Sequence, residues 1–174
     1  EPGWLDVGQT VQSALSTGRP VYLIKPMPGL EVVARLGEPE PSGLTPVLGA
    51  AVSAPPAHAM DAVLGDAVRL LGYDAQHTGD TLTVEVQWQA VRPLAADYTS
   101  FVQALAADGS KLAQSDHLVG GVYYPTSLWP AGATLLDRHI LALPAGATPA
   151  HLLIGMYQWV GDEAVTLGAV EVGK

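Results

Sequence analysis

YYPTSLWPAGATLLDRHILALPAGATPAHLLIGMYQW, the stretch from Tyr123 to Trp159, decides the fold. Two apolar runs, residues 134–143 and 151–159, flank the turn segment 144–149, and a loop with three aromatic residues between two prolines precedes them. Apolar runs of this length, bounded by Pro and Gly, are typical of β-strands. The pattern predicts the edge of an antiparallel β-sandwich that carries a rigid aromatic loop, and it indicates no chemistry by itself.

The clearest strand outside that stretch is residues 81–90, TLTVEVQWQA. Its apolar residues alternate with polar ones, a period typical of a strand with one buried and one wet face. They are Leu82, Val84, Val86, Trp88 and Ala90. Further strands are predicted at 67–74, 98–106, 111–115, 134–143, 151–159 and 164–172, and the run 151–159 is apolar on both faces, as a central strand should be. This spacing predicts an all-β domain over residues 61–174, an antiparallel β-sandwich of immunoglobulin-like or jelly-roll-like type.

The segments before that domain differ from it in pattern. Residues 1–36 predict a small α/β extension, with a helix over 7–15 and a strand over 21–24. Residues 37–60, rich in Pro, Gly and Ala, predict a linker or a long surface connection, or alternatively a Pro-rich edge packed across the sandwich. Because one helix and one strand cannot close a core, we expect residues 1–36 to pack on the sandwich.

Composition excludes several classes of function. The 174 residues include no Cys, so no disulfide, thiolate nucleophile or zinc thiolate site exists. Seventeen acidic and eight basic residues give a net charge of −9, and the basic residues are scattered singly, so nucleic acid and anionic lipid are not expected as partners. No apolar run reaches the roughly 20 residues that span a bilayer, so no membrane insertion by these residues is expected. Because the chain starts at Glu1, we expect it to be a processed or partial product. No cofactor is expected.

The order of landmarks between residues 66 and 172 resembles that of a known domain. These landmarks are Leu71-Gly72-Tyr73, Val84-x-Val86-x-Trp88-Gln89, Asp97-Tyr98-x-x-Phe101-Val102, Asp108-Gly109, Gln114-x-Asp116, Gly120-Gly121-x-Tyr123-x-Pro125-Thr126-x-x-Trp129-x-x-Gly132 and Leu153-x-Gly155-x-Tyr157. The chain resembles the soluble β-sandwich domain at the C-terminus of bacterial membrane glycosyltransferases similar to dolichyl-phosphate-mannose–protein mannosyltransferases. The resemblance implies an extracytoplasmic domain of a larger membrane protein, in which the transferase chemistry lies in the membrane part.

The residues themselves indicate no catalytic centre. Ser115-Asp116-His117 holds the three residue types of a catalytic triad, but neighbours on a strand point to opposite faces. No two of the five His are spaced four apart on a helix, so no zinc site is predicted. Glu85 and Asp137 are not singled out as the paired carboxylates of a glycosidase. The chain is therefore predicted not to be an enzyme.

Calcium is the one metal for which candidate ligands arise. Asp108, Asp116 and Asp137 lie in or near predicted β-turns, and loop carboxylates often hold structural Ca²⁺. The alternative is that Asp108 shapes an Asx turn ahead of Gly109, while the other two bond loop backbone.

The aromatic loop is the strongest candidate for a binding site. Tyr123, Tyr124 and Trp129 can offer flat apolar faces to sugar rings, stiffened by two prolines. Their predicted polar partners are Asp116, His117 and Arg138. The alternative is that Trp129 and one Tyr cap the core of the sandwich. The leading hypothesis is a non-catalytic accessory domain that touches glycan, acceptor or the membrane part of the same polypeptide, on the extracytoplasmic face of the cell membrane. The alternative is a purely structural or protein-interaction module.

Overall fold

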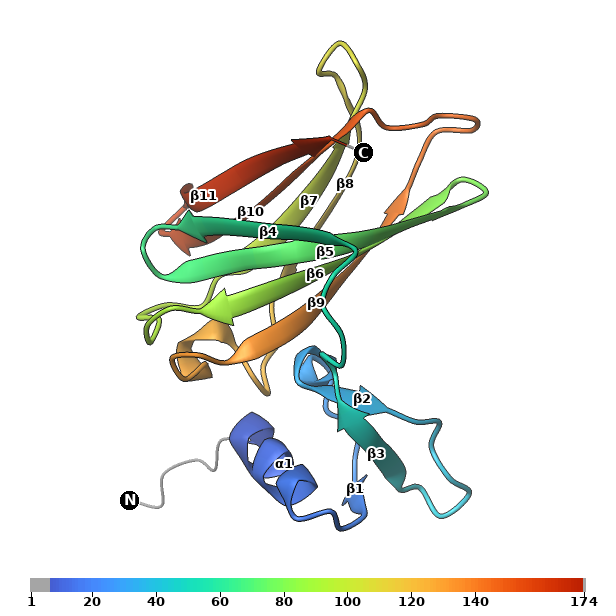
Figure 1. Ribbon diagram of the computed structural model, residues 1–174, viewed down its shortest axis with the longest axis vertical. Coiled ribbons are helices and arrows are strands. Elements are labelled where there is room, and N and C mark those ends of the chain that lie inside the picture. Colours follow the sequence, from blue (N-terminus) through green and yellow to red (C-terminus); the bar gives the residue numbers. More distant parts are fainter. Residues whose placement is uncertain (1–6, 174) are drawn as a thin grey trace.

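The chain folds as an all-β antiparallel sandwich preceded by a small N-terminal unit, in a computed structural model that describes residues 7–173 (Figure 1). Residues 1–6 of the predicted extension lie outside the described residues. One sheet has the order β4-β5-β6-β9, with strands His58–Leu64, Val68–Thr78, Thr81–Ala90 and Thr134–Ala142. The other has the order β11-β10-β7-β8, with strands Glu163–Gly173, His151–Val160, Thr99–Leu105 and Lys111–Leu118. The predicted fold class is confirmed.

The core forms where the predicted alternation places it. Leu82, Val84, Val86, Trp88 and Ala90 of β6 are all buried. Across the sandwich they share one core with residues of β7 and β10, namely Val102, Ala104, Leu152, Ile154 and Met156. β10 lies between β11 and β7, as its two apolar faces predict. Burying one face of each sheet against the other is what removes these side chains from water.

The edge formed by β8 and β9 positions the candidate site. The predicted hairpin of β7 and β8 is confirmed, and it makes β8 the last strand of its sheet. β9 is the last strand of the opposite sheet, so the turn at 144–149 carries the chain from one sheet to the other between β9 and β10. β8 and β9 therefore face each other across the open edge of the sandwich.

The N-terminal unit contains two strands, β2 and β3, that the sequence pattern does not predict. Its elements are α1 (Val7–Ser16), β1 (Val21–Leu23), the 3₁₀ turn η1 (Leu30–Val32), β2 (Ala34–Leu36) and β3 (Thr45–Ala50). β3 is the middle strand of a sheet with the order β1-β3-β2. The linker prediction for 37–60 is thus wrong for 45–50, and for 58–60, which begin β4. The three-residue strands β1 and β2 each need a hydrogen-bonding partner, and β3 offers one edge to each. Among the described residues, no helix has the length and apolar character needed to cross a bilayer.

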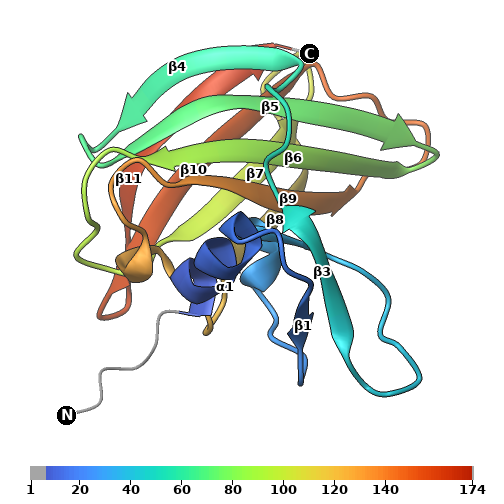
Figure 2. The same ribbon diagram turned by 60° about the horizontal axis from the view of Figure 1, so that its bottom comes forward.

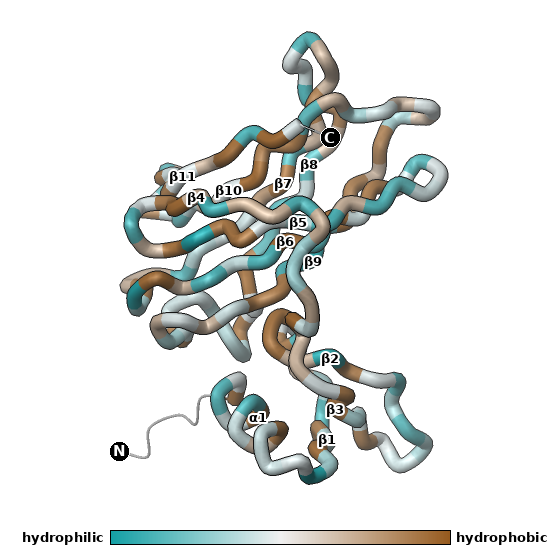
Figure 3. Tube along the Cα trace, viewed as in Figure 1, coloured by the Kyte–Doolittle hydropathy of each residue, from teal (hydrophilic) through white to brown (hydrophobic). Residues whose placement is uncertain are grey.

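This unit packs on the sandwich, as expected for residues 1–36. α1 and η1 lie under the β8–β9 edge (Figure 2), and η1 is a hydrophobic turn on the side of the unit nearest the sandwich (Figure 3). Leu30 and Val32 of η1 are buried in the common core. A Cβ on Gly8 would lie 2.4 Å from the ring of Tyr124, and one on Gly29 would lie 2.1 Å from the carbonyl oxygen of Gly120. Backbone of the unit therefore touches the sandwich directly.

Candidate functional site

A cluster of polar side chains lies inside the sandwich at the β8–β9 edge. The alternation of β9 turns Leu135, Asp137, His139 and Leu141 inward, and Asp137 and His139 are fully buried. Burying a carboxylate is costly unless other groups bond and neutralise it. The buried carboxylate of Asp137 therefore needs hydrogen-bonding and charged partners within the sandwich.

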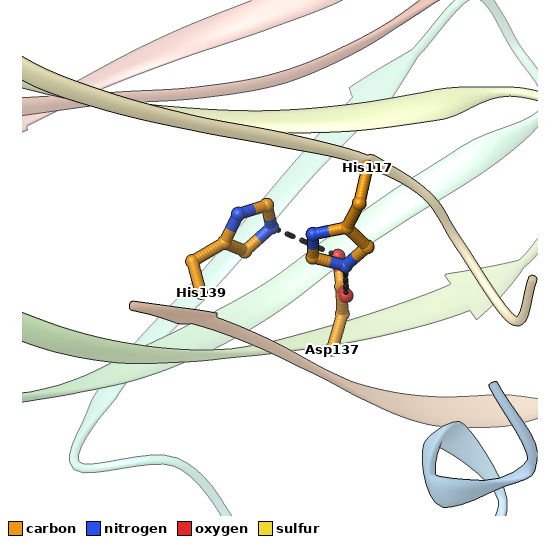
Figure 4. A group of neighbouring side chains, drawn as sticks. All are labelled: His117, Asp137 and His139. Carbon is orange, nitrogen blue, oxygen red and sulfur yellow. Dashed lines mark hydrogen bonds and ion pairs between the residues drawn. The ribbon is translucent and has the colours of Figure 1, made fainter. Parts of the chain in front are cut away.

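Asp137 has four side-chain partners, which come from β6, β7, β8 and its own strand β9. Figure 4 shows the two histidines among them, His117 and His139. His117 of β8 places Nε2 2.6 Å from Oδ1. Oδ2 accepts hydrogen bonds from Ser100 Oγ of β7 at 2.5 Å and from Trp88 Nε1 of β6 at 3.3 Å. His139 Nε2 lies 3.1 Å from the same oxygen. The carboxylate thus joins both sheets of the sandwich.

His139 is held from both sides of its ring. Nε2 lies 2.9 Å from Ser100 Oγ as well as near Asp137. Nδ1 lies 3.1 Å from the backbone oxygen of Ser115 and 3.2 Å from its Oγ. In a catalytic triad the nucleophile and the carboxylate face opposite nitrogens of the imidazole. Here Ser100 and Asp137 face the same nitrogen, so they do not form a triad with His139.

The electrostatics of the cluster favour an ion pair between His117 and Asp137. Burial alone would raise the pKa of Asp137, but hydrogen bonds from His117 and His139 outweigh burial and hold that pKa well below its usual value. The hydrogen bond to Asp137 raises the pKa of His117, because the carboxylate favours the imidazolium. His117 is only half-buried, whereas the carboxylate is enclosed.

A cavity of about 830 Å³ opens beside this pair, between the N-terminal unit and the β8–β9 edge. His117 and Asp137 form part of its wall. Further charged side chains on the wall are Glu31 and Arg35 from the N-terminal unit and Glu85 and Arg138 from the sandwich. Apolar surface comes from Val32, Leu36 and Leu136. The cavity exists because the N-terminal unit covers an edge that the sandwich alone would leave open.

The aromatic loop does not form the predicted binding surface. Tyr124 and Trp129 are buried, and Trp129 Nε1 donates a hydrogen bond to the backbone oxygen of Tyr124. Tyr124 is covered by Gly8 of α1, so neither ring has a face for a sugar. Tyr123 is half-buried, with Lys25 Nζ 5.9 Å from its ring centre. The alternative that Trp129 and one Tyr cap the core is the correct one.

The predicted polar partners of that loop separate onto two faces. His117 and Arg138 line the cavity, and Arg138 Nε lies 3.7 Å from Glu85 Oε1. Asp116 lies on the outer face of β8, where its Oδ2 accepts a hydrogen bond from the hydroxyl of Tyr157 at 3.2 Å. Two of the three predicted residues thus share one site, and that site is away from the buried loop aromatics.

The candidate calcium ligands do not come together. Asp108 Oδ1 accepts hydrogen bonds from the backbone nitrogen and the hydroxyl of Ser110, the Asx turn expected as the alternative. Asp116 is exposed on β8. Asp137 is bound by two histidines inside the sandwich. No calcium site is formed by these three aspartates.

The His–Asp–His cluster does not follow from helical metal-ligand spacing or from residues adjacent in sequence, because its members lie on strands. On a strand, residues two apart share a face. Asp137-x-His139 and Ser115-x-His117 have that spacing, and both pairs point inward. The available signal was that Asp137 and His139 share one face of the run 134–143 with the apolar residues Leu135 and Leu141. The contribution of Glu31 and Arg35 had no sequence signal, because it depends on how the N-terminal unit packs.

Comparisons with known proteins leave the function open. No protein-family model and no curated protein matches the chain. Among solved structures, part of a β-glucuronidase from glycoside hydrolase family 2 is similar, with 14% identity and a TM-score of 0.39. That match covers 62% of this chain and 11% of the enzyme, so the chain spans about a tenth of that protein's length. This similarity carries no argument about activity.

Proposed function

We propose that the chain is a non-catalytic ligand-binding domain whose site is the cavity between the N-terminal unit and the β8–β9 edge. We propose further that it acts as an extracytoplasmic accessory domain of a membrane glycosyltransferase-like protein, which rests on the resemblance of its landmarks. The observation that carries the binding proposal is the cavity itself. Its volume of about 830 Å³ lies in the range of small-molecule sites, about 300–1,000 Å³.

The chemistry of the wall suits a ligand with many hydroxyl groups. Carboxylates accept hydrogen bonds, whereas guanidinium groups donate them. Both kinds occur on the wall, in Glu31 and Glu85 and in Arg35 and Arg138. A hydroxyl both donates and accepts, so a short carbohydrate matches this mixture better than a uniformly charged or apolar molecule. Carbohydrate is also the class that the resemblance favours.

The arrangement of the nucleophile-type residues supports a non-catalytic role. Ser100 is fully buried and is not part of the cavity wall, so a ligand in the cavity does not reach its hydroxyl group. Glu85 lies beside Arg138, so one of the wall carboxylates is already neutralised. We therefore expect binding without turnover.

Ligand-observed NMR tests the proposal. A panel of neutral, acidic and amino sugars at about 10 mM detects the millimolar affinities expected from a few hydrogen bonds. Val122→Trp fills the cavity mouth, because Val122 lines it and is 80% exposed. Val160→Trp is the matched control on β10, also exposed and outside the cavity wall. Binding should be lost in Val122→Trp and kept in Val160→Trp. Failure of every sugar to bind, or equal binding by both variants, would refute the proposal.

A protein-interaction module is the second candidate, favoured by an apolar patch on the β10–β11 hairpin. Trp159, Val160 and Val165 are exposed there, and the ring of Tyr157 lies 5.8 Å from that of Trp159. Contiguous apolar surface often marks a partner site. Hydrogen exchange of residues 157–165 should then slow in the full polypeptide relative to the isolated domain. Equal exchange in the two would exclude this role for the patch.

A further inference from the structure

We propose that His117, Asp137 and His139 form a binding site for a divalent transition-metal ion, with Zn²⁺ as the best match. One ligand atom from each residue lies within 4.8 Å of the other two. Two imidazole nitrogens with one carboxylate oxygen are a donor set that suits Zn²⁺ and other first-row divalent ions. The inference holds whatever molecule fills the cavity.

The spacing of the ligand atoms fits one ion with modest adjustment. His117 Nε2 is 2.6 Å from one oxygen of Asp137, and His139 Nε2 is 3.1 Å from the other. Two ligands bound at about 2.0–2.2 Å in tetrahedral geometry around one ion lie about 3.3–3.6 Å apart, so the half-exposed His117 ring would have to move away from the carboxylate by about 1 Å. The two rings are tilted by 34° with centres 4.4 Å apart, so the imidazoles lie next to each other.

Hydrogen bonds from neighbouring groups hold His139 and Asp137 in the way that is usual for metal ligands. A ligating His commonly donates its other ring N–H to a backbone carbonyl, which directs the remaining nitrogen towards the ion. His139 Nδ1 has such a partner in the backbone oxygen of Ser115, at 3.1 Å. Ligating carboxylates are likewise hydrogen-bonded, and Asp137 accepts from Ser100 and Trp88. The buried half of the site is therefore preformed.

Access and an open coordination position come from the cavity. His139 is fully buried, but His117 is half-exposed and lines the cavity together with Asp137. An ion reaches the cluster from that side. With three protein ligands, its remaining position faces the cavity, where water or a ligand oxygen can bind.

The test is metal uptake by the purified protein. Protein stripped with EDTA is titrated with Zn²⁺ by calorimetry and with Co²⁺ by visible absorption, which reports nitrogen and oxygen ligands directly. We expect one ion per chain, with affinity at least tenfold weaker in His117→Ala. His151→Ala is the matched control, because His151 is a similarly exposed histidine at another position, beside Glu171. The His151→Ala variant should bind Zn²⁺ and Co²⁺ with the affinity of the parent protein.

Circular dichroism and thermal melting check the folding of His117→Ala, which we expect to be intact because the His117 side chain is half-exposed. His117→Gln provides a second variant of similar size. Absence of saturable uptake by the parent would overturn the proposal and leave the cluster as a hydrogen-bond network between the sheets. Equal uptake by the parent and both folded His117 variants would also overturn it. Because the readout is metal alone, this failure is distinct from failure of sugar binding.

Discussion

Replacing Trp88 by alanine should strongly destabilise the sandwich. Trp88 is fully buried, and its Nε1 donates to Asp137, so the change leaves a large cavity and removes a hydrogen bond. Truncating a buried tryptophan costs about 3–5 kcal/mol. In a domain of about this size each kcal/mol lowers the melting temperature by about 2–4 °C, so a decrease of about 6–20 °C is expected.

Urea unfolding followed by circular dichroism measures this effect. The midpoint should fall while the dependence of free energy on urea stays constant, since a change in stability alone moves only the midpoint. Trp159→Ala is the matched control, because Trp159 is 61% exposed and surface changes usually stay within about 0.5 kcal/mol. If the two variants unfold at the same urea concentration, the assignment of Trp88 to the core is refuted.

Three further predictions concern the cluster and the junction. Asp137→Asn should lower the free energy of unfolding, measured in urea, by about 3–5 kcal/mol, because the imidazoles of His117 and His139 would lose their carboxylate partner. A loss below about 1 kcal/mol would contradict this. With EDTA present, stability should fall below about pH 4, where the unfolded chain protonates Asp137 but the native chain resists. The stability should also fall as pH rises above about 6.5, because native His117 then loses its proton. Melting temperatures that stay constant across both pH ranges would be inconsistent with the ion pair. Gly29→Ala should lower the free energy of unfolding by about 2–5 kcal/mol, because the new Cβ would meet the carbonyl group of Gly120. Gly43→Ala is the control, since Gly43 has a similar φ but lies in open space, and it should cost about 1–2 kcal/mol. Equal melting temperatures of the two variants would argue against close docking of the N-terminal unit on the sandwich.

The sandwich was predictable because its strands carry their own signals. The alternation in β6 and the inward residues Leu152, Ile154 and Met156 of β10 reflect burial, and burial of one face of a strand leaves a period of two in the sequence. β3 leaves no such trace, because its burial alternates weakly and Pro46 interrupts its hydrogen-bonding pattern. The small sheet depends on pairing between segments, which a local pattern does not report.

The site was harder to predict than the fold, for reasons that particular residues illustrate. The burial of Tyr124 depends on Gly8 approaching from a helix more than a hundred positions earlier in the chain. The sequence predicts His117 and Arg138 as binding residues beside the aromatic loop, whereas they line the cavity. Their true neighbours, Glu31 and Arg35, reach the cavity only through docking of the N-terminal unit. Asp137 and His139 did carry a usable signal, the alternate spacing on one strand.

Histidine ring resonances recorded during a sugar titration test the central claim, that the cavity beside His117 is the ligand site. His117 lines the cavity, whereas His58, His77 and His151 lie outside its wall. Two-dimensional carbon–proton spectra of the ring, assigned with single His variants, follow all of them at once. A saturable shift of His117 with the other three unmoved is the predicted result. Saturation that leaves His117 in place while another histidine or Trp159 shifts would contradict the account.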